Sequence, residues 1–161
     1  MKSFLKITSL TMASLIFLAG PALAIEVKKE QIVNAPITKV WDKIGGWCAI
    51  KDWHPVIADC KEERKGEQLR RTLFLDGGGE VYEVLTGENE TSYSYIIESG
   101  ALPVENYKST LSVTAMDNDK TKITWKGNFT GGQGKTDQEA ADVMGGAYEA
   151  GLKAVAKDLE K

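Results

Sequence analysis

The sequence contains few of the residues from which metal and nucleic-acid sites are built. Its 161 residues include one histidine and two cysteines, which nearly excludes zinc sites with several ligands and iron–sulfur clusters. The formal net charge of −3 leaves no excess of basic residues, so we expect no nucleic acid among the partners. No residue pattern indicates a cofactor.

The length and composition indicate one globular domain. A chain of 161 residues is long enough for one ordinary domain and too short for two. Hydrophobic residues make up 42% and charged residues 27%, which excludes a disordered, collagen-like or multi-span membrane chain.

Residues 1–24 have the three parts of a secretory signal peptide. Two lysines give a positive start, an apolar run covers residues 7–18, and an Ala-Leu-Ala segment precedes the expected cleavage point after Ala24. An uncleaved anchor is the alternative, but the run is short for a membrane span of about 20 residues. We therefore predict an exported, periplasmic or secreted chain of residues 25–161, with no membrane span after cleavage.

The predicted export bears on whether the two cysteines form a disulfide. In an oxidising compartment Cys48 and Cys60 are a candidate disulfide pair, because they are the only two cysteines of the chain. The alternative is two unpaired core thiols whose geometry does not permit a bond.

The apolar pattern predicts one strand, two short helices and then a series of strands. Residues 25–33 alternate and predict a strand, a helix follows over 37–44, and a second short helix over 47–53 is broken at Pro55. From there the period drops to two, and turn residues separate about six further runs. The rows that share a face include Arg71, Leu73 and Leu75; Tyr93, Tyr95 and Ile97; Tyr107, Leu111 and Val113; and Ile123, Trp125 and Phe129.

The last segment predicts a long helix, Asp137–Leu159. Thr136 and Glu139 form a capping box in front of an apolar stripe. Three glycines, Gly145, Gly146 and Gly151, interrupt this helix at a cost in stability. They either allow the helix to approach the sheet closely or leave space beneath it for a ligand, and the sequence does not separate the two.

An antiparallel sheet of this length can curl around a long helix and leave a cavity between them. Segments that match a known family are Val40-Trp41, Trp53-His54-Pro55 with Cys60, Arg71-Thr72-Leu73 before the glycines 77–79, Leu102-Pro103-Val104, Asn106–Ser109 and Tyr148–Leu152. On these residues the chain resembles the START/SRPBCC superfamily, which includes the birch-pollen allergen, polyketide cyclase/dehydrase-type proteins and the plant abscisic acid receptors. It is most similar to exported bacterial members, among them accessory proteins of methanol oxidation.

The resemblance implies an α+β helix-grip fold, in which a curved antiparallel sheet of about seven strands wraps around the C-terminal helix. It also implies that a small hydrophobic or amphipathic molecule binds in the cavity between them. The loops Asp76–Glu80 and Gly100–Glu105 correspond to those that close over ligand in the hormone receptors. Ala58 replaces the receptors' carboxylate-anchoring lysine, and Ala101-Leu102 replaces their partner-docking His-Arg pair, so plant-type hormone sensing is not implied.

The expected ligand-binding residues are Arg71, Glu80, Tyr82, Tyr95, Leu102, Pro103, Tyr107, Met144 and Tyr148. Arg71 and Glu80 flank the glycine loop and act as polar anchors of the ligand, or else they form an ion pair. The tyrosines either direct their hydroxyls into the cavity or fill the core. His54 precedes a proline and has no nucleophile motif beside it, so we expect a structural role for it and no catalytic residue.

The sequence favours a periplasmic carrier for a small hydrophobic molecule, which enters between the two loops and the N-terminal half of the long helix. Two alternatives remain open. The first is a cyclase or dehydratase that uses tyrosine and glutamate as acid–base groups in the same cavity. The second is an accessory protein that acts on a periplasmic protein partner, such as a dehydrogenase, through its surface.

Overall fold

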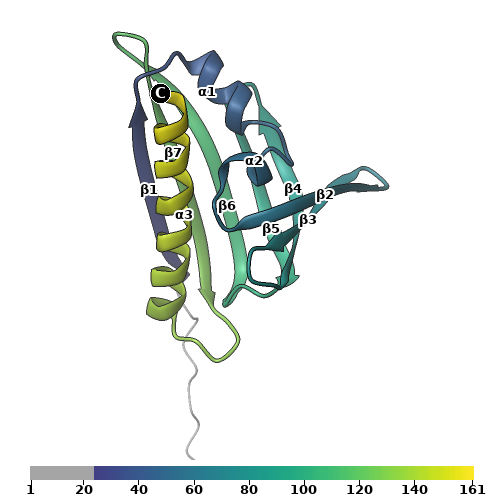
Figure 1. Cartoon of the computed structure of the whole chain (residues 1–161). Coiled ribbons are helices and arrows are strands. Elements are labelled where there is room, and N and C mark those ends of the chain that lie inside the picture. Colours follow the sequence, from purple (N-terminus) through teal and green to yellow (C-terminus); the bar gives the residue numbers. More distant parts are fainter. Residues whose placement is uncertain (1–23) are drawn as a thin grey trace, which may run out of the picture.

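A seven-stranded antiparallel sheet curves around the C-terminal helix (Figure 1). The structure is a computed structural model that describes residues 24–161, so the predicted signal peptide lies outside the described residues apart from Ala24. The elements are β1 (Ile25–Val33), α1 (Ile37–Ile44), α2 (Ile50–Trp53), β2 (Ile57–Lys65), β3 (Gln68–Leu75), β4 (Glu80–Asn89), β5 (Ser92–Gly100), β6 (Val104–Met116), β7 (Lys120–Gly131) and α3 (Asp137–Leu159).

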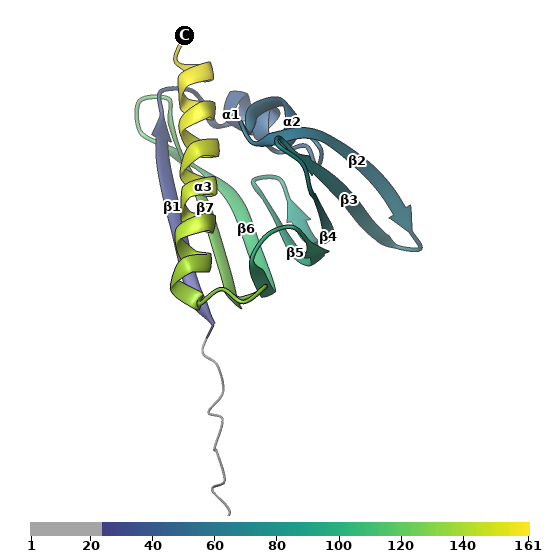
Figure 2. The same cartoon turned by 60° about the horizontal axis from the view of Figure 1, so that its bottom comes forward.

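The strand order β1-β7-β6-β5-β4-β3-β2 joins sequence neighbours everywhere except at the β1–β7 pair. Register shifts interrupt the β2–β3, β4–β5 and β6–β7 ladders, and such bulges bend a sheet. Figure 2 shows α3 along β1 and β7, with α1 close to one end of α3 and α2 beside β2. The predicted α+β helix-grip fold is confirmed.

Local sequence signals set the ends of the helices. The Thr136 hydroxyl accepts a hydrogen bond from Glu139 N, and the Glu139 carboxylate accepts one from Thr136 N, so the predicted capping box begins α3. Helix α2 is shorter than predicted, because residues 47–49 form a turn. The amides of Ala49 and Asp52 donate to carbonyls three residues earlier, which is tighter than α-helical pairing.

One hydrophobic core fills the space between the sheet and the helices. It is built from the rows that the alternation predicts, together with the apolar stripe of α3; its largest fully buried apolar side chains include Tyr95, Tyr148, Phe129, Ile44, Leu111 and Ile123. No helix within residues 24–161 is long and apolar enough to cross a membrane.

The predicted disulfide is confirmed. Cys48 and Cys60 are bonded, with their Cα atoms 5.6 Å apart. The bond ties the turn before α2 to the edge strand β2, so it holds the two short helices against the sheet. Disulfides persist in oxidising compartments, which agrees with the predicted export.

We predict that replacing both cysteines, Cys48→Ser with Cys60→Ser, lowers the free energy of unfolding by about 3 kcal/mol. The reason is that the bond closes a short loop and removes conformations of the unfolded chain. Urea denaturation of the variant and of the oxidised protein measures the difference. Equal midpoints, or two titratable thiols in the exported protein, would contradict the prediction.

The three glycines of α3 have different surroundings. A Cβ atom on Gly151 would lie 2.5 Å from His54 Cδ2, so this glycine allows close contact with α2. Gly145 packs towards Val27 and Lys29 of β1, and a Cβ on Gly146 would meet no atom within 4 Å. None of the three lines the cavity between sheet and helix. The interpretation that they leave space for a ligand is therefore wrong, and close packing explains Gly151.

Gly146 and Gly151 give a matched pair of variants. We predict that Gly151→Ala destabilises the protein by about 1–3 kcal/mol, because the new methyl group collides with a buried ring. Gly146→Ala should stabilise it by about 0.5–1 kcal/mol, because alanine fits the open position and favours the helix. Thermal unfolding of both variants checks the opposite signs, and a shift of the same sign in both would count against this packing.

Candidate functional site

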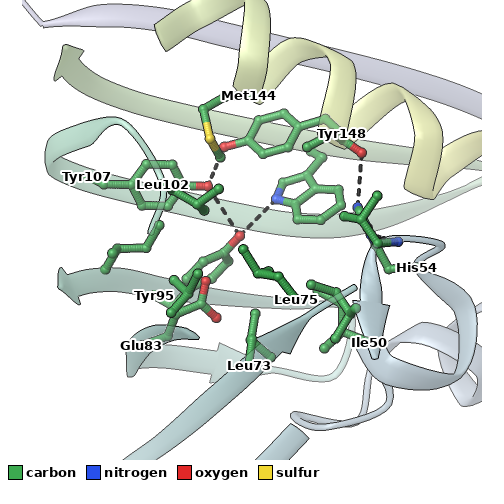
Figure 3. A pocket seen from close by; sticks show the side chains of 16 residues that line it. Ile50, His54, Leu73, Leu75, Glu83, Tyr95, Leu102, Tyr107, Met144 and Tyr148 are labelled. Atoms are coloured by element: carbon green, nitrogen blue, oxygen red, sulfur yellow. Dashed lines mark hydrogen bonds between the residues drawn. The ribbon is translucent and has the colours of Figure 1, made fainter. Parts of the chain in front are cut away.

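A small cavity lies between the concave face of the sheet, α2 and the N-terminal half of α3 (Figure 3). Its volume is about 50 Å³, and its walls are mostly apolar. The residues that line it are Ile50, His54, Val56, Ile57, Leu73, Leu75, Val81, Glu83, Tyr95, Ile97, Leu102, Tyr107, Trp125, Met144, Ala147 and Tyr148. Ligand sites for drug-sized molecules usually measure about 300–1,000 Å³, so this cavity is too small for such a molecule without a rearrangement.

Three apolar side chains form the mouth of the cavity. Val56, in the turn after α2, is 43% exposed, whereas Leu75, at the end of β3, and Leu102, in the loop before β6, are half-buried. Leu75 and Leu102 border the two loops that were expected to cover a ligand. The loops touch each other, because a Cβ on Gly79 would lie 2.8 Å from the Cβ of Ala101.

Several hydrogen bonds hold the two loops. Ala101 N donates to Glu80 O at 2.9 Å and joins one loop to the other, and Gly132 N donates to Pro103 O at 3.0 Å. Gln133 Nε2 donates to the carbonyl oxygens of Gly100 and Leu102, at 2.8 and 3.1 Å. Asp76 N donates to Val56 O at 2.9 Å, which joins the glycine loop to the turn after α2. Residues 77–79 all have φ between 90° and 102°, a region that glycine enters without steric cost. Separate hydrogen bonds and one contact between the loops therefore hold the mouth in this conformation, and each can break independently of the others.

A chain of hydroxyl groups crosses the cavity wall that faces α3. Tyr107 OH is hydrogen-bonded to Tyr148 OH, and it lies 3.3 Å from Tyr95 OH. Trp125 Nε1 donates to Tyr95 OH at 3.0 Å and to Ser109 Oγ at 3.2 Å. The Trp125 and Tyr148 rings stack with their centroids 4.5 Å apart. The three phenols thus belong both to the core and to the cavity, where Figure 3 shows their hydroxyls close together.

These phenols are neutral at physiological pH. Burial raises the pKa of Tyr148 to about 12 and holds the pKa values of Tyr95 and Tyr107 well above the ordinary value of 10. The network consequently presents hydrogen-bonding groups and no charge.

A buried ion pair lies on the opposite side of the cavity. Arg71 Nε donates to Glu83 Oε2 at 2.5 Å, and the side chains are 0% and 4% exposed. Arg71 also donates to the carbonyl oxygen of Trp47, and its guanidinium lies 3.8 Å from the Trp47 ring centroid. Burial raises the pKa of the Glu83 carboxyl group above its ordinary value, and the positive charge of Arg71 opposes this shift.

His54 links α2 to α3. Its Nε2 lies 3.0 Å from Ala147 O, and Val56 N donates to its Nδ1 at 3.4 Å. Since a carbonyl can only accept, Nε2 carries the hydrogen and the ring is neutral. Burial lowers the pKa of His54 to about 4, whereas the hydrogen bond to Ala147 raises it by a smaller amount. The structural role that the sequence predicts for this residue agrees with both bonds.

This depressed pKa gives a pH dependence with a definite sign. Unfolded histidine binds a proton near pH 6.5, but His54 in the folded protein binds one only near pH 4. Its contribution to stability is therefore complete above pH 6.5 and decreases as the pH falls towards 4, by up to about 3 kcal/mol. We predict that His54→Gln, which can still donate to Ala147 O, flattens the stability profile over this interval. Urea denaturation at each pH measures it, and parallel profiles of variant and wild type would refute it.

Five of the nine predicted ligand-binding residues line the cavity: Tyr95, Leu102, Tyr107, Met144 and Tyr148. The other four do not. Glu80 and Tyr82 are exposed and hydrogen-bond to each other on the outer face, Pro103 lies beside the mouth, and Arg71 is buried and paired with Glu83. The ion pair between Arg71 and Glu80 that the sequence left open does not form, because Arg71 pairs with Glu83 instead.

Three polar residues at or near the cavity were not among the predicted site residues. Glu83 shares a face with Val81 in the period-two pattern, and this inward position of a carboxylate was the available signal. His54 was expected to be structural and was not placed at the cavity wall, which it lines. Gln133 gave no signal, because only the folded chain brings it to the carbonyls of the loop.

Comparisons with known proteins agree with this geometry. A profile of the family described as "Polyketide cyclase / dehydrase and lipid transport" matches residues 24–160. XoxI from Bacillus cereus is similar in structure, with a TM-score of 0.79 and 29% identity over 84% of this chain and 96% of that chain. No curated protein matches the chain.

Two more distant structures share the fold. A START superfamily protein from Mycobacterium smegmatis has a TM-score of 0.70 at 18% identity and covers 84% of this chain and 97% of that chain. The Zhui aromatase/cyclase from Streptomyces sp. R1128 has a TM-score of 0.69 at 17% identity, with 85% and 94% covered. Together with the family profile, these likenesses support a fold that binds hydrophobic ligands.

Proposed function

The chain belongs to the polyketide cyclase/dehydrase and lipid transport family, and on this basis we propose that it is an exported carrier for a small hydrophobic or amphipathic molecule. The observation that carries the proposal is the apolar cavity between the sheet and α3, whose mouth is formed by exposed Val56 and half-buried Leu75 and Leu102. The disulfide between Cys48 and Cys60 supports an oxidising compartment, and we propose the periplasm.

The size of the cavity requires the mouth to open when a ligand binds. A volume of about 50 Å³ holds a few water molecules and no molecule of lipid or aromatic-polyketide size. The loops at residues 76–79 and 101–103 are the parts that would move, because they border the mouth and three consecutive glycines with positive φ form the first.

The polar groups of the cavity favour a carrier over an enzyme. Both ring nitrogens of His54 are engaged with backbone groups. The phenols of Tyr107 and Tyr148 are hydrogen-bonded to each other, and their raised pKa values make them weak acids at neutral pH. A general acid or base works best with a pKa near the operating pH, and these groups lie far from it. The cyclase or dehydratase alternative therefore has less support.

Two neighbouring residues of α3 provide a sharp test of the cavity. Met144 lines the cavity, whereas Val143 is 45% exposed on the other side of the helix. We predict that Met144→Trp lowers the affinity for the uncharged fluorescent probe N-phenyl-1-naphthylamine at least about tenfold, because indole fills the space. Val143→Trp is the control and should leave the affinity unchanged.

The measurement is a fluorescence titration of the probe, with circular dichroism to show that both variants are folded. Equal affinities in the two folded variants would refute binding in this cavity. Native mass spectrometry of protein purified from the exported fraction adds a second result. A retained small molecule supports the carrier, whereas a stoichiometric protein partner together with an empty cavity would favour the accessory role.

A further inference from the structure

The polar lining of the cavity has a distinctive charge pattern, and this inference rests on the proposed carrier function. In the described part of the chain, none of the sixteen lining residues is a lysine or arginine. The neighbouring arginine, Arg71, does not line the cavity, and its guanidinium is paired with Glu83, which does. The lining histidine, His54, is neutral because both its ring nitrogens are held by backbone groups. A ligand in the cavity therefore meets no free positive charge.

The carboxylate that lines the cavity has unused hydrogen-bonding capacity. Arg71 Nε donates to Oε2 of Glu83, and no described residue donates to the other carboxylate oxygen, Oε1. The β4–β5 register places Glu83 opposite Ile97, two residues from Tyr95 on the same face of the neighbouring strand. Glu83 and Tyr95 consequently lie side by side on the cavity floor, where Figure 3 labels both.

The hydroxyl chain can also supply one donor. Ser109 uses its hydrogen on Lys126 O at 2.8 Å, so it can only accept from Tyr148 or Trp125. If Tyr148 donates to Tyr107 and Tyr107 donates to Tyr95, the Tyr95 hydrogen is left without an acceptor in the network. The opposite direction uses every hydroxyl hydrogen internally. The network can therefore release the Tyr95 hydroxyl to a ligand without losing an internal bond between phenols.

We propose that the cavity selects an uncharged amphipathic alcohol or phenol, whose hydroxyl group donates to Glu83 and accepts from Tyr95, and that it rejects carboxylates of the same size. A hydroxyl group matches the two protein groups, because it contains one donor and can accept in return. It also leaves the Arg71–Glu83 pair intact.

The same cavity disfavours a ligand that carries a carboxylate group. It would lose its hydration in an apolar cavity without gaining a counter-ion, and such desolvation is strongly unfavourable. It would also lie beside Glu83, a group of like charge in a low-dielectric site, where repulsion is stronger than in water. The selectivity then follows from the absence of a lysine or arginine in the lining as much as from the presence of Glu83 and Tyr95.

The test compares 2-naphthol with 2-naphthoate as competitors of N-phenyl-1-naphthylamine. Near neutral pH the first is uncharged and the second is ionised, and the two have the same aromatic body. We expect 2-naphthol to displace the probe at a concentration at least about tenfold lower. Equal displacement, stronger displacement by 2-naphthoate, or no displacement by either would overturn the proposal while probe binding keeps the carrier function. Absence of probe binding would instead overturn the carrier function and this inference with it.

Two tyrosine variants separate the hydroxyl group from the apolar contact. Tyr95→Phe should weaken 2-naphthol binding several-fold and leave 2-methylnaphthalene, which has no hydroxyl group, unchanged. Tyr82→Phe is the matched control, because Tyr82 is 42% exposed and its hydroxyl bonds to Glu80 on the outer face. An equal loss for both ligands in Tyr95→Phe would overturn the assigned contact.

Glu83→Gln tests the charge directly. Removal of the carboxylate leaves Arg71 without its counter-ion, so a folded variant should bind 2-naphthoate better than wild type does and 2-naphthol less well. An unchanged preference in the folded variant would overturn the role of Glu83. If the variant does not fold, the competition in wild type and the Tyr95→Phe comparison still decide the proposal.

Discussion

The buried pair of Arg71 and Glu83 is the interaction on which the arrangement of the site depends. The pair joins β3 to β4, and the Arg71 bond to Trp47 O extends it to the turn before α2. Isolated burial of either charge would cost several kcal/mol, and loss of one partner of such a pair typically destabilises a protein by about 3–5 kcal/mol. The turn that Arg71 holds also contains Cys48, so a covalent bond and an ion pair fix the same segment. Helix α2 is in this way placed where His54 can reach α3.

The same pair determines the electrostatic character of the cavity. Glu83 lines the cavity and is paired with Arg71, which does not line it, so a ligand in the cavity lies next to the carboxylate of the pair. Within residues 24–161, Arg71 Nη2, Tyr93 OH and Trp47 Nε1 are buried without a hydrogen-bond partner, and all three belong to this cluster. Not every hydrogen-bond donor of this cluster therefore has a partner. The cluster fixes two strands and a turn, and it contributes no positively charged residue to the lining of the cavity.

The parts of the fold that were predictable are those with local signals. The alternation of residues 25–33 gave β1, and the capping box of Thr136 with the apolar stripe gave α3 with its correct ends. The expectation that Glu80 stands beside Arg71 failed for a different reason. Proximity in sequence to the glycine loop suggested Glu80, but pairing across strands depends on register, and the β3–β4 ladder sets Arg71 opposite Glu83. Register is fixed by bulges and turns that a single sequence does not reveal.

The hydroxyl network had no local signal either. Its members come from β5, β6, β7 and α3, and they meet only because the sheet curves around the helix. A tyrosine that only fills the core and a tyrosine whose hydroxyl group faces the cavity give the same alternation of apolar and polar residues. The sequence pattern therefore does not distinguish them. The glycines of α3 show the converse, since Gly151 suggested space for a ligand when it actually permits contact with His54. In both cases the decisive distance joins segments that are far apart in the sequence.

The closed mouth also limits which ligands can bind with useful affinity. Opening it breaks the bonds from Gln133 to the second loop and from Asp76 to Val56, each of which contributes about 1 kcal/mol net. Burial of apolar surface returns about 25 cal/mol per Å², so a ligand must bury more than roughly 100 Å² before the opening is offset. A molecule small enough for the closed cavity of about 50 Å³ offers little surface of this kind. With no counter-ion for a charged group, the affinity has to come from an apolar body large enough to separate the loops, and a single hydroxyl group then only orients it.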